Sequence, residues 1–138
     1  MITLPWIHGP AAKTTPLTPR TVMASRLELL HLRHVPALLI ASIRLRHAIP
    51  QGDGAVGLAL RARPLARTFW TLSAWTDQQA LQAYNQSPLH RGIVERFRRH
   101  MASSTFRFYA AEDGPPPRWD EALRRLTAQE SHEAGVEG

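Results

Sequence analysis

The chain has 138 residues, 43% hydrophobic and 20% charged, which is enough for one globular domain with its own core and too few for two. It has no cysteine and a single lysine, Lys13, which excludes thiolate nucleophiles, disulfides and iron–sulfur clusters and disfavours Schiff-base chemistry. The formal charge of +6 is uneven, because residues 1–112 carry 14 basic and 5 acidic side chains whereas residues 113–138 carry 3 and 6. The arginines are dispersed rather than massed with exposed aromatic residues, so we expect no nucleic-acid partner.

The first 19 residues predict an extended arm. Four prolines interrupt them, and this composition opposes both helix and sheet. The segment has no basic start and its apolar stretch is broken, unlike a secretory signal. The longest apolar run, residues 35–41, is far shorter than the ~20 residues that span a bilayer. We therefore expect a cytoplasmic protein that does not contact membranes.

The residues that follow alternate between strand and helix patterns. A first strand is predicted over 21–29 and a helix over 35–47, with Pro36 in its first turn. After a glycine turn at 52–54, the runs 55–63 and 67–75 are typical of a β-hairpin.

The second half predicts a helix in two pieces and a last strand. Thr76 and Gln79 have the spacing of a capping box, with Thr76 as the N-cap. Ser87 and Pro88 restart the helix, whose apolar side chains recur every four residues. A strand over 105–110 would place Phe106 and its neighbour Phe108 on one face. A short C-terminal helix is predicted over 119–126.

This order predicts an α+β, ferredoxin-like βαββαβ domain over residues 20–112, with an antiparallel four-stranded sheet. Residues 113–138 would form a proline-rich linker, the extra C-terminal helix and an acidic tail. Helices on one face would leave the other face of the sheet bare, and a second copy could cover it. We therefore expect a homodimer.

Residues 68–81, TFWTLSAWTDQQAL, followed by SPLHR at 87–91, resemble the strand-then-helix core of antibiotic-biosynthesis-monooxygenase-like proteins and are similar to spheroidene-monooxygenase-like sequences. The resemblance covers about residues 20–112 and implies a dimeric α/β barrel. Members of this superfamily oxidise polyketide aromatics without a cofactor, use haem, or catalyse redox-neutral cyclisations and isomerisations.

We expect no metal and no cofactor. The resemblance implies a haem-binding histidine where this chain has Val94, so haem would need His90 as a substitute ligand. His31 and His34 have near-helical spacing but no accompanying carboxylate, which disfavours a metal site. The short glycine turn precedes a strand and does not form a phosphate loop.

Four polar residues around the helix break are candidates for catalysis and binding. His90 follows the cap Ser87, where the helix dipole disfavours imidazolium, so it could act as a general base; a solvated surface histidine is the alternative. Tyr84 and Arg91 are further catalytic candidates, and Asn85 is a candidate for substrate binding. Such donors could hold a deprotonated substrate.

The other substrate-binding candidates lie on strands. Trp75 shares a face with Phe69 and Ser73 and could wall a cavity for a flat ligand, although core packing would use the same residues. Arg26 would need an anionic partner if it points inward, either a ligand or Glu28, and could instead be exposed.

The leading functional prediction is a monooxygenase of specialised metabolism, of the antibiotic, polyketide or terpenoid type, that acts on a small apolar polycyclic or polyene substrate. A redox-neutral cyclase or isomerase and a non-catalytic ligand-binding dimer are the alternatives.

Overall fold

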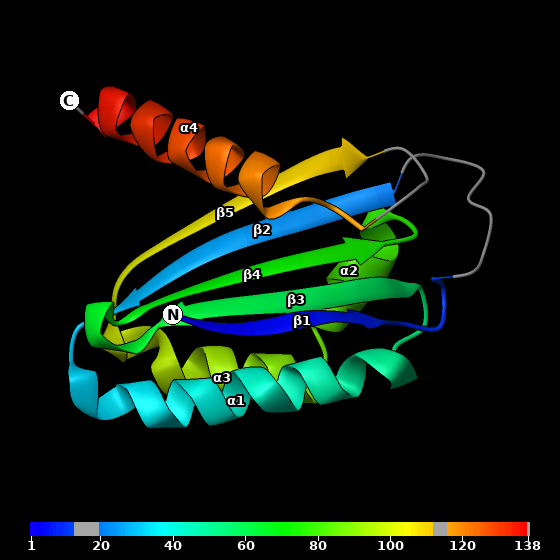
Figure 1. Ribbon diagram of the computed structural model, residues 1–138, viewed down its shortest axis with the longest axis horizontal. Coiled ribbons are helices and arrows are strands. Elements are labelled where there is room, and N and C mark those ends of the chain that lie inside the picture. Colours follow the sequence, from blue (N-terminus) through cyan, green and yellow to red (C-terminus); the bar gives the residue numbers. More distant parts are fainter. Residues whose placement is uncertain (13–19, 112–115, 138) are drawn as a thin grey trace.

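The computed structural model describes residues 1–12, 20–111 and 116–137, and within this part the chain forms a five-stranded sheet with helices on both faces (Figure 1). The strands are β1 (Ile2–His8), β2 (Arg20–Leu29), β3 (Ala55–Arg63), β4 (Thr68–Trp75) and β5 (Met101–Ala111). The helices are α1 (Val35–Ala48), α2 (Gln78–Asn85), α3 (Pro88–Phe97) and α4 (Trp119–Glu137).

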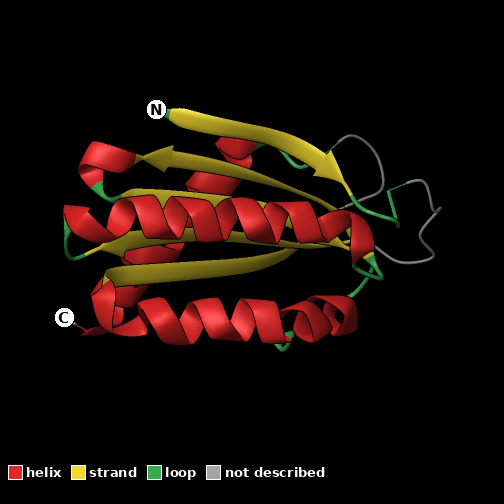
Figure 2. Cartoon of the chain, turned by 90° about the horizontal axis from the view of Figure 1, so that it is seen from below, coloured by secondary structure: helices red, strands yellow, loops and turns green. Residues whose placement is uncertain are grey.

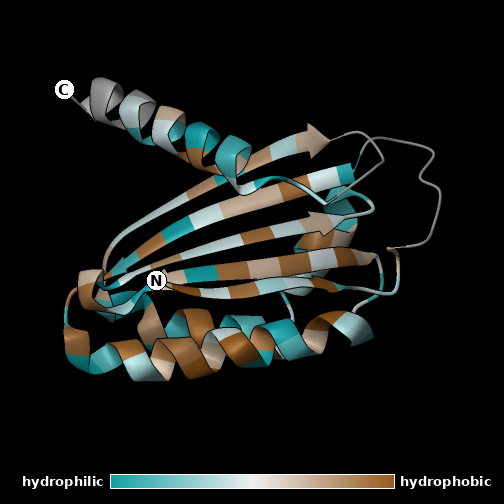
Figure 3. Ribbon diagram, in the orientation of Figure 1, coloured by the Kyte–Doolittle hydropathy of each residue, from teal (hydrophilic) through white to brown (hydrophobic). Residues whose placement is uncertain are grey.

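The sheet is antiparallel throughout, in the order β1-β3-β4-β2-β5. Strands β2 to β5 with α1 and the α2–α3 pair form the predicted βαββαβ unit, and the ferredoxin-like α+β prediction is confirmed. Helices cross the near face of the sheet in Figure 2, and bands of different hydropathy follow one another along the strands in Figure 3.

The sheet has one strand more than the sequence predicts. Residues 2–8 of the expected arm form β1, which pairs with β3 from Ile2 opposite Ala62 onward. The register shifts between Leu4 and Ile7, and Pro5 lies within this irregularity on the sheet edge, where its missing N–H breaks no ladder. The Pro5 carbonyl instead accepts hydrogen bonds from Arg46 of α1 at 3.1 and 2.8 Å. The later part of the expected arm, residues 13–19, lies outside the described residues.

Helix α4 lies on the sheet face opposite α1–α3, over β5 and β2 (Figure 1), and it is longer than the predicted helix over 119–126. Its buried side chains Ala122 and Leu126 belong to one cluster with apolar residues of the sheet: Val22, Ala24, Val56, Leu72 and Ala74. Arg107 of β5 also donates a hydrogen bond to Gln129 of α4 at 3.1 Å. The expectation of a bare face is therefore wrong, because the chain supplies its own cover. The homodimer stays a prediction, but a bare sheet face no longer gives a physical reason for it.

The sequence predicted the N-cap of α3 correctly but not that of α2. Asp77, not Thr76, is the N-cap of α2, and its carboxylate accepts a hydrogen bond from the Ala80 N–H at 2.8 Å. The Thr76 N–H still donates to the Gly54 carbonyl at 2.9 Å, so Thr76 belongs to the strand connection. Ser87 caps α3 as predicted, accepting from the His90 N–H at 3.3 Å.

Candidate active site

A largely apolar cavity of about 260 Å³ lies between the sheet and helices α1 and α3. Its floor comes from β2, β3 and β4, and its walls come from α1, α3 and the start of β5. The lining residues are Met23, Ser25, Leu27, Leu38, Ser42, Leu45, Leu58, Leu60, Thr71, Tyr84, His90, Ile93, Val94, Phe97, Arg98, Met101, Ser104 and Phe106. Such a lining, with a few polar groups among apolar ones, is typical of small-molecule sites.

Beside the cavity lies an open mouth of about 370 Å³, between α3 and the edge strand β5, which shares five of the cavity's lining residues. The mouth is lined by Met23, Asn85, His90, Arg91, Val94, Glu95, Arg98, Phe106 and Phe108. Phe106 and Phe108 are 46% and 49% exposed and lie on β5, the edge strand of the sheet in the described part of the chain. Two aromatic rings therefore form one wall of an entrance that faces the charged side of α3.

The polar groups in the cavity floor satisfy each other. Ser25 of β2 and Thr71 of β4 lie opposite one another in the sheet, and their hydroxyls are hydrogen-bonded. Because the two hydroxyls bond to each other, neither leaves an unsatisfied polar group in the largely apolar floor.

His90 lies in the first turn of α3, half-buried where cavity and mouth join. Burial lowers the pKa of its imidazole below the usual 6.5, and the Asn85 backbone opposes part of this effect. Its Nδ1 atom is buried and makes no hydrogen bond of ordinary geometry to a described residue. Because burial favours the uncharged form, the neutral imidazole predominates at pH 7, and one of its two ring nitrogens can accept a proton.

Tyr84, at the end of α2, lies beside His90 with the ring centroids 5.1 Å apart. Burial raises the pKa of the Tyr84 phenol well above its usual 10.0. The phenol thus stays protonated and can donate a hydrogen bond but cannot serve as a base. The two neighbouring side chains therefore have different chemistry, one a proton acceptor and the other a donor.

The structure places the other two predicted polar residues at the mouth. Asn85 and Arg91 both line the mouth and neither lines the inner cavity. They are positioned to contact the outer part of a bound molecule, one on each side of the Ser87 cap.

The predicted strand residues do not line the cavity. Trp75 is 1% exposed and packs behind Tyr84, with ring centroids 4.7 Å apart, and its indole N–H donates to Ser73 at 3.0 Å. Ser73 is fully buried with it, and Phe69 is buried against α1 and α3. These residues occupy the helix-facing side as predicted, but they form the core that supports the cavity rather than its wall.

Arg26 lies on the opposite face of the sheet from the cavity. Met23, Ser25 and Leu27 of β2 line the cavity, so strand alternation directs Arg26 towards α4. There it pairs with Glu130 at 3.7 Å, a residue far away in sequence. This placement corrects the expectation that Arg26 binds the substrate; Glu28, the other suggested partner, pairs with Arg67.

Arg98 and the two exposed phenylalanines line the site although the sequence did not single them out. Arg98 follows α3 and lines both the cavity and the mouth. His90, Val94 and Arg98 recur every four residues, which places them on one face of a helix. This spacing could have indicated that Arg98 shares the site of His90, but it fits a solvent-exposed helix face equally well.

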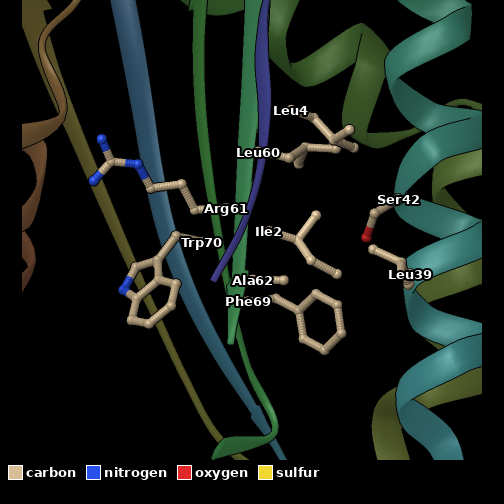
Figure 4. A pocket seen from close by; sticks show the side chains of 9 residues that line it. All are labelled: Ile2, Leu4, Leu39, Ser42, Leu60, Arg61, Ala62, Phe69 and Trp70. Atoms are coloured by element: carbon tan, nitrogen blue, oxygen red, sulfur yellow. The ribbon is translucent and has the colours of Figure 1, made fainter. Parts of the chain in front are cut away.

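A second hollow, a crevice of about 10 Å³ with room for at most one water, lies between α1 and the β1 side of the sheet (Figure 4). Leu4, Leu60 and Phe69 face α1 there, whereas Arg61 and Trp70 project from the other face of the sheet. It has no group suited to catalysis.

Within residues 1–12, 20–111 and 116–137, no three histidine, aspartate or glutamate side chains gather as metal ligands would. His34 instead stacks on His100, with centroids 3.8 Å apart. No helix in the same ranges is long and apolar enough to cross a membrane.

Solved structures with a similar fold include several proteins described as oxygenases or candidate monooxygenases. A candidate antibiotic biosynthesis monooxygenase from Deinococcus radiodurans aligns with a TM-score of 0.61 at 13% identity, over 71% of this chain and 98% of the other. SnoaB from Streptomyces nogalater, described as a cofactor-independent oxygenase, aligns with a TM-score of 0.54 at 16% identity, over 72% and 99%. The chain has the fold of these monooxygenases.

A candidate monooxygenase from Lactobacillus acidophilus aligns with a TM-score of 0.58 at 9% identity, over 73% of this chain but only 50% of that protein. No protein-family profile and no curated protein sequence matches the chain. The likeness is therefore one of fold, and function has to be argued from the site.

Proposed function

We propose that this protein is a cofactor-independent monooxygenase of specialised metabolism that acts on a small apolar aromatic or polyene molecule. The observation that carries the proposal is an apolar cavity with a neutral histidine and a protonated tyrosine side by side at one end. The fold shared with SnoaB, a cofactor-independent oxygenase, supports the same class.

The chemistry needs a substrate that can itself reduce dioxygen. His90 would remove a proton from an acidic C–H or O–H group, and Tyr84 would donate a hydrogen bond to the oxygen that becomes negative. The substrate anion then supplies the electrons. When a CH₂ group becomes a carbonyl, one oxygen atom enters the product and the other leaves as water with both hydrogens. The apolar lining of the cavity strengthens the interaction of Tyr84 with the anion.

The test is dioxygen consumption with a panel of polycyclic phenols and ketones, with the oxygenated product identified by mass spectrometry. We expect turnover to stop without dioxygen, to fall by about 10²-fold or more in His90→Gln, and to be unchanged in His47→Gln, an exposed histidine outside the cavity. The acid limb of the pH profile should have its midpoint below 6.5.

Two results would overturn this proposal. Product formation that continues under strict anaerobiosis would indicate a redox-neutral cyclase or isomerase. Tight binding of these compounds without turnover would indicate a ligand-binding protein.

A further inference from the structure

Arg98 is the one permanently charged side chain among the residues that line the inner cavity within the described ranges. Its guanidinium forms no ion pair or hydrogen bond with a described residue. Other arginines near the sheet are held, since Arg26, Arg67 and Arg107 bond to Glu130, the Leu29 carbonyl and Gln129, respectively. The exposed donors of Arg98 therefore remain available to a bound molecule.

The surroundings of Arg98 do not neutralise its charge. Glu95 lies at the same mouth, but no ion pair joins it to Arg98 or to Arg91 among the described residues. The mouth therefore carries two arginines and one glutamate, next to a neutral His90. A guanidinium at the rim of an apolar cavity, with aromatic rings opposite, fits a molecule that has an apolar body and one anionic group.

The distance between Arg98 and the proton acceptor sets the shape of this molecule. Eight residues separate His90 from Arg98 along α3 and its last turn, which corresponds to about 12 Å at the helical rise. On the opposite wall, Met23 to Leu27 of β2 spans about 13 Å. His90 and Arg98 therefore line the cavity from positions about 12 Å apart along the helix axis, with Tyr84 beside His90.

We propose that Arg98 binds the carboxylate of an elongated apolar substrate and so holds the reacting carbon beside His90. This inference rests on the proposed function and adds the substrate class, an apolar acid of about 12 Å in length. A carboxylate is favoured because one planar guanidinium matches its two oxygens. Arg98 is then a positioning residue that sets which substrate atom reaches the base.

The test is equilibrium binding of anthracene carboxylate, its methyl ester and an anthracene phosphate ester, followed by ligand fluorescence. Wild type should prefer the carboxylate to the methyl ester. Arg98→Gln should bind the carboxylate about fivefold to tenfold more weakly and leave ester affinity unchanged. Arg98→Lys should keep part of the preference. The matched control is Arg99→Gln, which removes the same charge from a neighbouring exposed residue that does not line the cavity and should leave both affinities unchanged.

The outcomes separate this inference from the proposed function. Equal binding of carboxylate and methyl ester by wild type, or an unchanged Arg98→Gln variant, overturns the role of Arg98 while the cavity stands. Tighter binding of the phosphate ester overturns the carboxylate assignment. If Arg98→Gln binds neither the carboxylate nor the methyl ester, Arg98→Lys is the deciding variant. An Arg98→Lys protein that binds the carboxylate no better than the methyl ester overturns the inference. Wild type that binds none of the three refutes the cavity as a ligand site, and with it the proposed function.

Discussion

Replacement of Leu126 by alanine tests whether α4 is the cover of the outer sheet face. Leu126 is 2% exposed and belongs to the apolar cluster on the outer face of the sheet, where α4 packs on β5 and β2. Leucine-to-alanine changes in cores cost roughly 2–5 kcal/mol. We expect about 3 kcal/mol, near the low end, because α4 packs on one layer and can move into the space. Alanine is a good helix former, so the loss would not come from helix propensity.

The assay is thermal and denaturant unfolding followed by circular dichroism. A loss of about 3 kcal/mol should lower the Tm by about 10 °C in a chain of this size. Arg124→Ala, an exposed position on the same helix, should change the free energy of unfolding by no more than about 0.5 kcal/mol. If Leu126→Ala behaves like Arg124→Ala, α4 does not cover the sheet, and the case for a second copy on that face returns.

Three further predictions concern the site and its supports. The unfolded chain protonates His90 at a higher pH than the folded chain, so the free energy of unfolding should fall as the pH drops through 6.5. Denaturant titrations at pH about 7.5 and about 5.5 should show a smaller fall for His90→Gln than for wild type. An equal fall in both proteins would contradict the lowered pKa of His90. Ile93→Trp should fill the cavity and abolish binding of anthracene carboxylate while circular dichroism stays unchanged, and ligand binding that persists would place the site elsewhere. Asp77→Ala should cost about 1 kcal/mol in urea unfolding through loss of the α2 cap, whereas Thr76→Ala should cost less than about half of that; the reverse order would restore Thr76 as the cap.

Much of the fold followed from local patterns. Hydrophobic alternation and proline and glycine positions located β2, α1, the β3–β4 hairpin and the Ser87 cap to within a few residues. Strand alternation also separated the Phe106 face of β5 from its Arg107 face. These features depend on neighbours in sequence, which is why the sequence predicts them.

The candidate site was predictable in part. His90, Tyr84, Asn85 and Arg91 flank one helix break, so their closeness in sequence brings them close in space. The candidates on the strands do not line the cavity. The face of a strand on which a residue lies does not reveal whether its side chain reaches a cavity or is covered by another side chain. Tyr84 covers Trp75, and that contact joins two separate elements.

What the sequence determined by itself was the order of strands and helices from residue 20 onward, the absence of cysteine chemistry and the polar cluster around Ser87. Only the tertiary structure decided which residues share the cavity, that β1 joins the sheet edge and that α4 covers the outer face. The physical reason is that burial and pairing between distant segments depend on competition among all surfaces of the chain, whereas periodicity and capping depend on a few adjacent residues.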